Sequence, residues 1–231
     1  MNPDCGYVLA VVPYREHDAM ITFLSENHGL MRLILPGYYK PKSKQGKLGL
    51  EYSYVKYESK FNDNQLNRIT GGELQDGYLT RRSDFDWLLY SSCLSEITIR
   101  CYDEEYHDLF YAMFTKGLRD TSQVIILIEL VKSIIEIQGI TPDVTGCVIC
   151  GSSMISQFSV EQGGYLCQQH ARNHRYNQKE LLIALKGLFT RESIRDYLEE
   201  IDAKQVLSVL IDYLEYHGDY KFNSWKLISN V

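Results

Sequence analysis

Residues Tyr7–Gly37 read YVLAVVPYREHDAMITFLSENHGLMRLILPG, and this stretch decides the fold of the N-terminal part. It contains three short apolar runs, which we interpret as strands: Tyr7–Val12, Met20–Leu24 and Leu30–Leu35. Arg32 interrupts the third run, and Pro36-Gly37 after it is a turn signal. Apolar runs of this length between polar turns predict β-structure.

Two further strands are predicted after this turn. The polar, basic segment Lys40–Lys47, which we name the cationic loop, leads into a longer strand candidate at Leu48–Glu58. Within that candidate, Tyr52 and Tyr54 share one face, and Val55 and Tyr57 share the other. After a turn at Phe61–Asn64, Gln65–Leu74 is the fifth strand candidate. Five short strands favour a small barrel, because closure removes exposed edges, and an SH3-like barrel fits the strand count equally well.

The apolar spacing becomes helical after Asp84. Helices are predicted around Phe85–Ile97, around Leu109–Phe114, and at Val124–Ile137, which is apolar almost all round and suits the centre of a bundle. Lys179–Glu200 has the pattern of two short helices with Thr190 as a cap between them. Asp202 is a suitable N-cap for a helix over Ala203–His217, and Gly218 is expected to end it in the left-handed conformation.

Composition indicates a soluble globular protein. The 231 residues are 45% hydrophobic and 23% charged, which argues against wholesale disorder. The longest apolar run, Val124–Ile137, contains three charged residues and is shorter than the roughly 20 residues of a membrane span. The N-terminus has no cationic stretch leading into an apolar one. We therefore expect a cytoplasmic protein that does not contact a membrane.

Four residues between Thr145 and His174 have the spacing of metal ligands. Cys147 and Cys150 form a C-x-x-C pair, and Cys167 and His170 form a C-x-x-H pair that begins seventeen residues after Cys150. Two such pairs suit a tetrahedral zinc site, and four protein ligands leave no open position for chemistry. The sequence therefore predicts one structural Zn²⁺ per chain, with His174 as a substitute for His170.

Two other interpretations of these cysteines remain open. They can be buried small hydrophobes, or Cys147 and Cys150 can be a redox pair, although no βαβ pattern surrounds them. The other three cysteines, Cys5, Cys93 and Cys101, lack partner spacing and are interpreted as packing residues.

The charge is distributed unevenly along the chain. Eight basic and three acidic residues between Gly29 and Arg68 give that window +5, so the remainder carries −11 of the total of −6. Lysines attract phosphates and exposed aromatic rings stack on bases, as in OB-fold barrels that hold single strands. We predict DNA contacts at Arg32, Lys40, Lys42, Lys44 and Lys47. The alternative is a solvated loop beside tyrosines that pack in the barrel.

No catalytic arrangement emerges from the sequence. It has no Gly-rich phosphate loop, no G-x-S-x-G and no H-E-x-x-H. The acidic run Asp103–Glu105 near His107 is interpreted as the solvated start of a helix rather than as a metal site.

The order of these parts resembles the bacterial recombination mediator family RecO. The stretches that carry the resemblance are Gly6–Leu9, Tyr14–Asp18, Phe23–Gly29, Gly37–Lys44, the cysteine pairs with Gly163–Cys167, and Tyr213–His217. One departure is Leu48–Tyr52, where the family often has glutamine, proline and phenylalanine. The resemblance implies an α+β multidomain protein: an N-terminal OB-fold β-barrel in residues 1–80, then an α-helical domain in 81–231 with an inserted four-ligand zinc motif at 145–174.

The resemblance also implies a non-enzymatic role in recombinational gap repair. RecO-like proteins bind single- and double-stranded DNA, anneal complementary strands and engage the C-terminal tail of the single-strand-binding protein SSB. With RecR they help to load RecA onto SSB-coated single strands. Two alternatives remain: an adaptor with an OB-fold and a zinc motif that lacks annealing activity, and a metal- or thiol-dependent enzyme.

Overall fold

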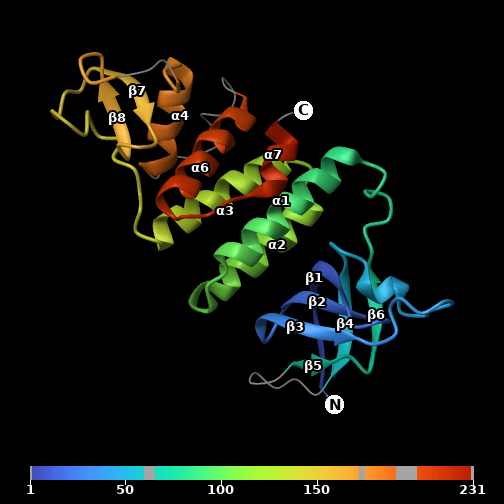
Figure 1. Ribbon diagram of the computed structural model, residues 1–231. Coiled ribbons are helices and arrows are strands. Elements are labelled where there is room, and N and C mark those ends of the chain that lie inside the picture. The colour runs from blue at the N-terminus through green and yellow to red at the C-terminus, as the bar shows by residue number, and fades with distance from the viewer. Residues whose placement is uncertain (1, 60–65, 172–174, 191–201, 230–231) are drawn as a thin grey trace. The chain divides into compact units, whose positions relative to one another are not determined.

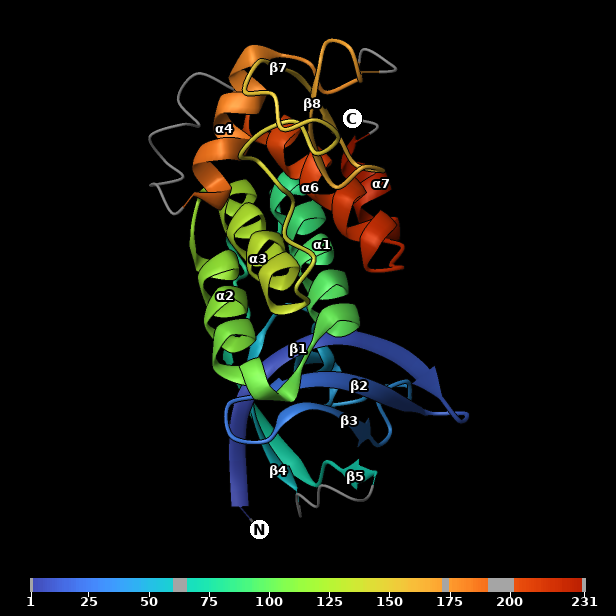
Figure 2. The same cartoon turned by 90° about the vertical axis from the view of Figure 1, so that its left-hand side faces the viewer.

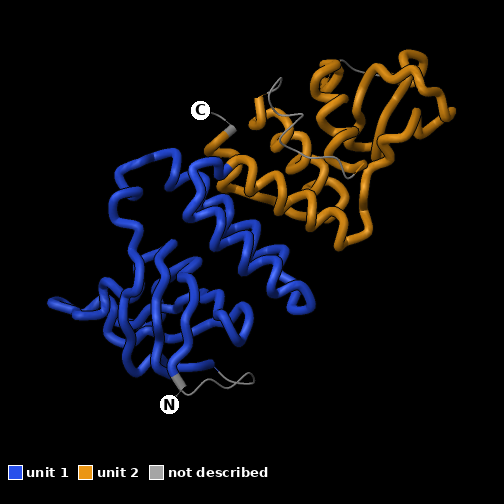
Figure 3. Tube along the Cα trace, turned by 180° about the vertical axis from the view of Figure 1, so that it is seen from behind, with its two compact units in different colours: residues 1–123 blue, residues 124–231 orange. Residues whose placement is uncertain are grey.

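The computed structural model describes residues 2–59, 66–171, 175–190 and 202–229. The chain divides into two compact units, residues 1–123 (unit 1) and 124–231 (unit 2), which are coloured separately in Figure 3. Unit 1 combines a sheet with helices, and unit 2 is mainly helical, so the protein is of the α+β class. A domain boundary at residue 80 stays a prediction. Among the described helices, none has the length and apolar character that crossing a bilayer requires.

In the part of unit 1 that the structure describes, the sheet has six strands: β1 (Asn2–Tyr14), β2 (Asp18–Ser25), β3 (Gly29–Leu35), β4 (Tyr54–Ser59), β5 (Asn67–Arg68) and β6 (Gly71–Asp76). Their order is β5-β3-β2-β1-β4-β6, and the pairing of β3 with β5 is parallel, unlike that of the other neighbours. The sheet curls into a half-barrel (Figures 1 and 2). Alternate residues such as Ile21, Phe23 and Val55 are completely buried in its core, which confirms the strand patterning.

Two strand predictions need correction. The predicted strand Leu48–Glu58 begins only at Tyr54, because Leu48 lies in a short 3₁₀ helix, η1 (Gly46–Gly49), and Tyr52 has a left-handed φ of 58°. A strand cannot pass through such a residue. The predicted strand Gln65–Leu74 is two strands within the described residues, β5 and β6, separated by Ile69 and Thr70.

Within the described residues, the second half of β1 has no strand paired with it on the side of β4, and side chains limit the free backbone N–H groups there. The pairing of β4 with β1 ends at Tyr7, and the register with β2 shifts between Val8 and Ala10. Beyond this bulge, the backbone N–H of Val11 donates to the Glu51 carboxylate at 2.9 Å. Two residues further on, Pro13 has no N–H to offer.

A buried carboxylate holds the turn between β2 and β3. Asp4 is 3% exposed and accepts hydrogen bonds from the Ser25 hydroxyl and, at 2.6 Å, from the Asn27 amide. The Ser25 oxygen in turn accepts from the backbone N–H groups of Asn27 and His28. These bonds explain why a serine and an asparagine stand in the FLSENHG stretch.

Two helices complete unit 1 (Figure 2). The first, α1 (Phe85–Cys101), begins at Asp84, whose carboxylate accepts from the N–H groups of Asp86 and Trp87. The second, α2 (His107–Arg119), follows a short 3₁₀ helix, η2 (Glu104–Tyr106). The Asp103 carboxylate caps η2, as predicted for the acidic run. The Ser95 hydroxyl donates to the Leu9 carbonyl at 2.7 Å, so α1 is tied to β1.

Unit 2 contains a hairpin and four described helices. These elements are α3 (Gln123–Ile137), which begins at the last residue of unit 1, β7 (Ile155–Ser159), β8 (Gly164–Cys167), α4 (Lys179–Phe189), α6 (Ala203–His217) and α7 (Asn223–Ser229). Gly139, with a φ of +68°, follows α3. The second half of the predicted helix pair at Lys179–Glu200 lies largely outside the described residues, and Thr190 is the C-cap of α4.

The end of α6 differs from the prediction. Gly218 is the C-cap, but its φ is −95°, and the left-handed residue is Asp219, with a φ of 56°. Asp is one of the few non-glycine residues that tolerate this conformation. The following helix α7 was not predicted, because its seven residues are too short for a periodic signal.

Asp202 is expected to stabilise α6 through its cap. Its carboxylate accepts from the Lys204 N–H at 2.9 Å. Asp202→Ala should lower the free energy of unfolding by about 1 kcal/mol, whereas Asp202→Ser should retain most of the stability. Urea denaturation of both variants would measure the difference. Equal loss in both would show that the hydrogen bond is not the source of the effect.

Candidate metal centre and cationic surface

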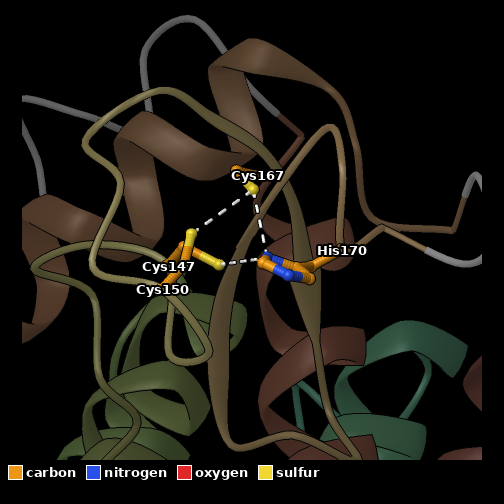
Figure 4. A group of neighbouring side chains, drawn as sticks. All are labelled: Cys147, Cys150, Cys167 and His170. Carbon is orange, nitrogen blue, oxygen red and sulfur yellow. Dashed lines mark hydrogen bonds between the residues drawn. The ribbon is translucent and has the colours of Figure 1, made fainter.

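Three cysteines and a histidine of unit 2 gather in one place (Figure 4). We name them the Cys3His cluster: Cys147, Cys150, Cys167 and His170. Their ligand atoms all lie within 4.8 Å of one another. The Cys150 and Cys167 sulfurs are 3.8 Å apart, and His170 Nδ1 is 3.5 Å from the Cys147 sulfur and 3.3 Å from that of Cys167. The structure thus brings together the four residues predicted from spacing.

Two tight turns present these side chains. In the first, the Gly151 N–H donates to the Cys147 carbonyl at 2.7 Å, and Gly151 has a left-handed φ of +71°. In the second, the N–H groups of His170 and Ala171 both donate to the Cys167 carbonyl. Each turn follows from a C-x-x-ligand spacing, because a turn of four residues points its first and last side chains to the same side.

The hairpin β7–β8 holds the two turns next to each other. The Val148 N–H donates to the Tyr165 carbonyl at 2.9 Å, which joins the first turn to β8. Gly164 allows this approach, because a Cβ there would lie 2.3 Å from the Asp143 carbonyl oxygen and 2.8 Å from Val148. The glycine pair before Cys167 therefore has a steric reason.

The distances between the ligand atoms of the cluster fit a tetrahedrally coordinated ion. Ligands bonded to Zn²⁺ at about 2.3 Å for sulfur and about 2.0 Å for nitrogen lie about 3.5–3.8 Å apart at tetrahedral angles. Burial raises the pKa of the Cys147 thiol, but backbone hydrogen bonds and the His170 ring outweigh it and lower that pKa to about 6. The thiolate is the form that binds metals, so the surroundings of Cys147 favour a cation. The substitute ligand His174 lies outside the described residues.

The five predicted DNA contacts all lie in unit 1 with exposed side chains. Lys40, Lys42 and Lys44 line a hollow of about 330 Å³, which we name the lysine hollow. Arg32 on β3 and Lys47 on η1 do not line it. The structure therefore brings three of the five residues together.

Backbone hydrogen bonds shape the segment around this hollow. The Tyr39 N–H donates to the His17 carbonyl at 2.9 Å, and the Gly37 N–H donates to the Asp18 carboxylate at 2.7 Å. Within the loop, the Ser43 N–H donates to the Lys40 carbonyl at 3.0 Å. Lys42 has a left-handed φ of 63°. The lysines are thus carried by a sequence of ordered turns anchored on the β1–β2 connection.

Most tyrosines near the cationic loop are not free stacking surfaces. Tyr57 is completely buried, and its hydroxyl donates to the Leu48 carbonyl. Tyr38 is half-buried against the core, whereas Tyr39 is 44% exposed and meets Tyr38 edge to face. Of this pair, Tyr39 is the ring that a base can reach.

One cation at the hollow was missed by the sequence reasoning. Arg68 lines the lysine hollow together with Asp18, and its guanidinium lies 3.7 Å from the Asp18 carboxylate. Arg68 was counted in the charge of +5 between Gly29 and Arg68, but it was not among the five predicted DNA contacts. Its position depends on the parallel pairing of β5 with β3, which no local pattern encodes.

These features define the class of protein. A curled sheet with a cationic hollow, together with a mainly helical unit bearing a Cys3His cluster that can hold a metal ion, is an α+β architecture.

Comparison with known proteins then identifies the relationship. Residues 1–78 match the family model described as "Recombination protein O N terminal". The chain is 25% identical to "DNA repair protein RecO" of Exiguobacterium sibiricum over 98% of this chain and 95% of that protein. It is 23% identical to the RecO protein of Oceanobacillus iheyensis over 98% of this chain and 92% of that one. The chain is therefore similar to RecO proteins over nearly its whole length, and the resemblance noted in the sequence is confirmed.

Proposed function

We propose that this protein is a DNA repair protein that acts as a recombination mediator. The observation that carries the proposal is the similarity to RecO proteins over nearly the whole length of both chains. The mediator would bind single- and double-stranded DNA and anneal complementary strands. With RecR it would help to load RecA onto SSB-coated single strands in gap repair, in the bacterial cytoplasm and without catalysing a reaction.

Unit 1 is the proposed DNA-binding part, with an OB-fold as its architecture. The curled, mainly antiparallel sheet and its exposed cationic loop are what such a fold uses to hold a strand. Arg32, Lys40, Lys42, Lys44 and Lys47 are the proposed phosphate contacts. Phosphate contacts release counterions, so binding should weaken steeply as salt is added.

Unit 2 would carry one structural Zn²⁺. The Cys3His cluster supplies three thiolates and an imidazole, the donors that zinc prefers, and four protein ligands would complete its shell. Bound there, the ion would stabilise the fold by linking the two turns. The helical part of the chain, residues 81–231, is the proposed place for the SSB tail.

Fluorescence anisotropy of a labelled oligonucleotide tests the mediator function. The protein is titrated onto free and SSB-coated single strands at two salt concentrations. The proposal expects salt-sensitive binding to both, with a ternary complex on the coated strand. Simple displacement of SSB would contradict the mediator role, and the absence of binding at low salt would favour the adaptor.

A further inference from the structure

Among the residues that the structure describes, the lysine hollow contains one acidic side chain, Asp18, at the start of β2. An acidic residue in a surface that binds phosphates lowers the local positive potential, and its presence therefore needs a reason. Asp18 is mostly buried, with 15% of its side chain exposed, while 53% of the Arg68 side chain is exposed. The carboxylate thus lies at the floor of the hollow, and the guanidinium is accessible to a ligand.

Asp18 contacts both the segment that carries the lysines and the arginine of the hollow. One carboxylate oxygen accepts the Gly37 N–H at 2.7 Å, at the base of the segment that carries the lysines. The other oxygen lies 3.7 Å from Arg68 Nη2. A single side chain of β2 therefore orders the cationic loop on one side and Arg68 on the other.

Arg68 is placed by the sheet rather than by a loop. It pairs with Ile34 in the parallel β3–β5 ladder, and the hydroxyl of Ser59 donates to its carbonyl at 3.0 Å. Lysines on a turn are mobile point charges, whereas a guanidinium offers a planar fork that fits phosphate oxygens. Arg68 is therefore the cation of the hollow with the best-defined position.

The ion pair with Asp18 leaves the Arg68 guanidinium accessible to a ligand. At 3.7 Å and with the guanidinium half exposed, it is a weak surface pair. The remaining donors of the guanidinium can reach a phosphate while Asp18 still orients the group.

We propose that Arg68 contacts a phosphate of single-stranded DNA in the lysine hollow, and that Asp18 is the positioning residue that orients Arg68 and anchors the cationic loop. This inference rests on the proposed function. It extends the site by a residue outside the predicted set and assigns a role to its one carboxylate.

Two substitutions at Asp18 separate its anchoring role from its charge. Asp18→Asn removes the negative charge but retains an oxygen that can accept the Gly37 N–H. Asp18→Ala removes both. If Asp18 orients Arg68 and anchors the loop, Asp18→Asn should bind a labelled single strand more weakly than the wild type even though a negative charge has been removed. Asp18→Ala, which also loses the hydrogen bond to Gly37, should bind at least about threefold more weakly than Asp18→Asn.

Arg68→Gln tests the contact itself. The magnitude of the slope of log K against log salt should fall by about 0.7, the value for one phosphate on a single strand. The ratio of the wild-type affinity to that of Arg68→Gln should therefore decrease about 2.6-fold between 50 and 200 mM salt. The matched control is Arg100→Gln, which removes an exposed arginine of α1 that pairs with Glu96 at 3.2 Å. This control should leave the slope unchanged, and thermal denaturation would verify that each variant is folded.

The outcomes distinguish the two proposals. If the wild type does not bind DNA at low salt, the proposed function fails and this inference fails with it. If the wild type binds but Arg68→Gln keeps the wild-type slope, the Arg68 contact is overturned while the function stands. Equal affinities for Asp18→Asn and Asp18→Ala would overturn the positioning role. Should Asp18→Ala not fold, a wild-type or higher affinity of Asp18→Asn would overturn it as well.

Discussion

Cys150→Ser is expected to empty the metal site and to destabilise unit 2. Cys150 is the most informative ligand to change, because its side chain is exposed while those of Cys147 and Cys167 are buried. Serine at this position costs no core packing, so any loss of stability comes from the lost ligand. Structural zinc contributes on the order of 10 kcal/mol to small domains, and losing even about 3 kcal/mol would lower the melting temperature by roughly 10 °C.

The measurement combines zinc stoichiometry with thermal denaturation. The wild type should hold one zinc per chain, and Cys150→Ser should hold much less. Ile149→Ser is the matched control, since Ile149 lies next to Cys150, is 52% exposed and offers no ligand. DNA binding by unit 1 should persist at temperatures where the variant is folded. An unchanged melting transition, or reversible oxidation of Cys147 and Cys150 in a zinc-free wild type, would contradict the structural role.

Charge reversal of the lysine hollow is expected to abolish most DNA binding. Lys40, Lys42 and Lys44 line one hollow, so replacing all three by glutamate would convert the three proposed phosphate contacts into repulsions. The affinity for single strands should fall by at least about 100-fold at 50 mM salt, and the salt slope should decrease by about 2, which is three contacts at 0.7 each. Different sequences should lose affinity to the same extent, because phosphates carry no sequence information.

The control for this variant must change the total charge equally. Lys179, Lys186 and Lys204 are exposed lysines of unit 2, and their replacement by glutamate makes the same change of −6. This triple variant should retain the wild-type affinity within about twofold. If both triple variants lost binding equally, the effect would come from net charge, and the hollow would not be the contact surface.

Local signals explain which elements could be predicted from the sequence. The alternation in β2 and β3 and the cap of α6 by Asp202 involve neighbouring residues, and these elements agree with the structure within a few residues. The Cys3His cluster was predictable for the same reason. Each C-x-x-ligand pair lies in one turn, and the single hairpin β7–β8 brings the pairs together.

Elements that depend on distant contacts were mispredicted or missed. Leu48–Ser53 has strand-like composition, but the buried Leu48 is drawn into the core, and the chain reverses at Tyr52 before β4 begins. Arg68 belongs to a strand of two residues whose only described partner is β3. A strand this short is stabilised by its pairing with β3, and two residues are too few to show the alternation of apolar and polar side chains that predicts a strand.

The covered side of β1 affects how copies of this protein behave when they are crowded. An exposed strand edge is a template on which another chain can add a strand, and this is a common route to aggregation. Here the Val11 N–H already donates to the Glu51 carboxylate, and Pro13, the next residue whose backbone nitrogen faces this side, has no N–H. If copies gathered at high local concentration along a single strand of DNA, as the proposed function would require, this side of β1 would face many identical neighbours. The hydrogen bond of Val11 to Glu51 and the missing N–H of Pro13 leave fewer donors on this side of β1 for a strand of such a neighbour to pair with.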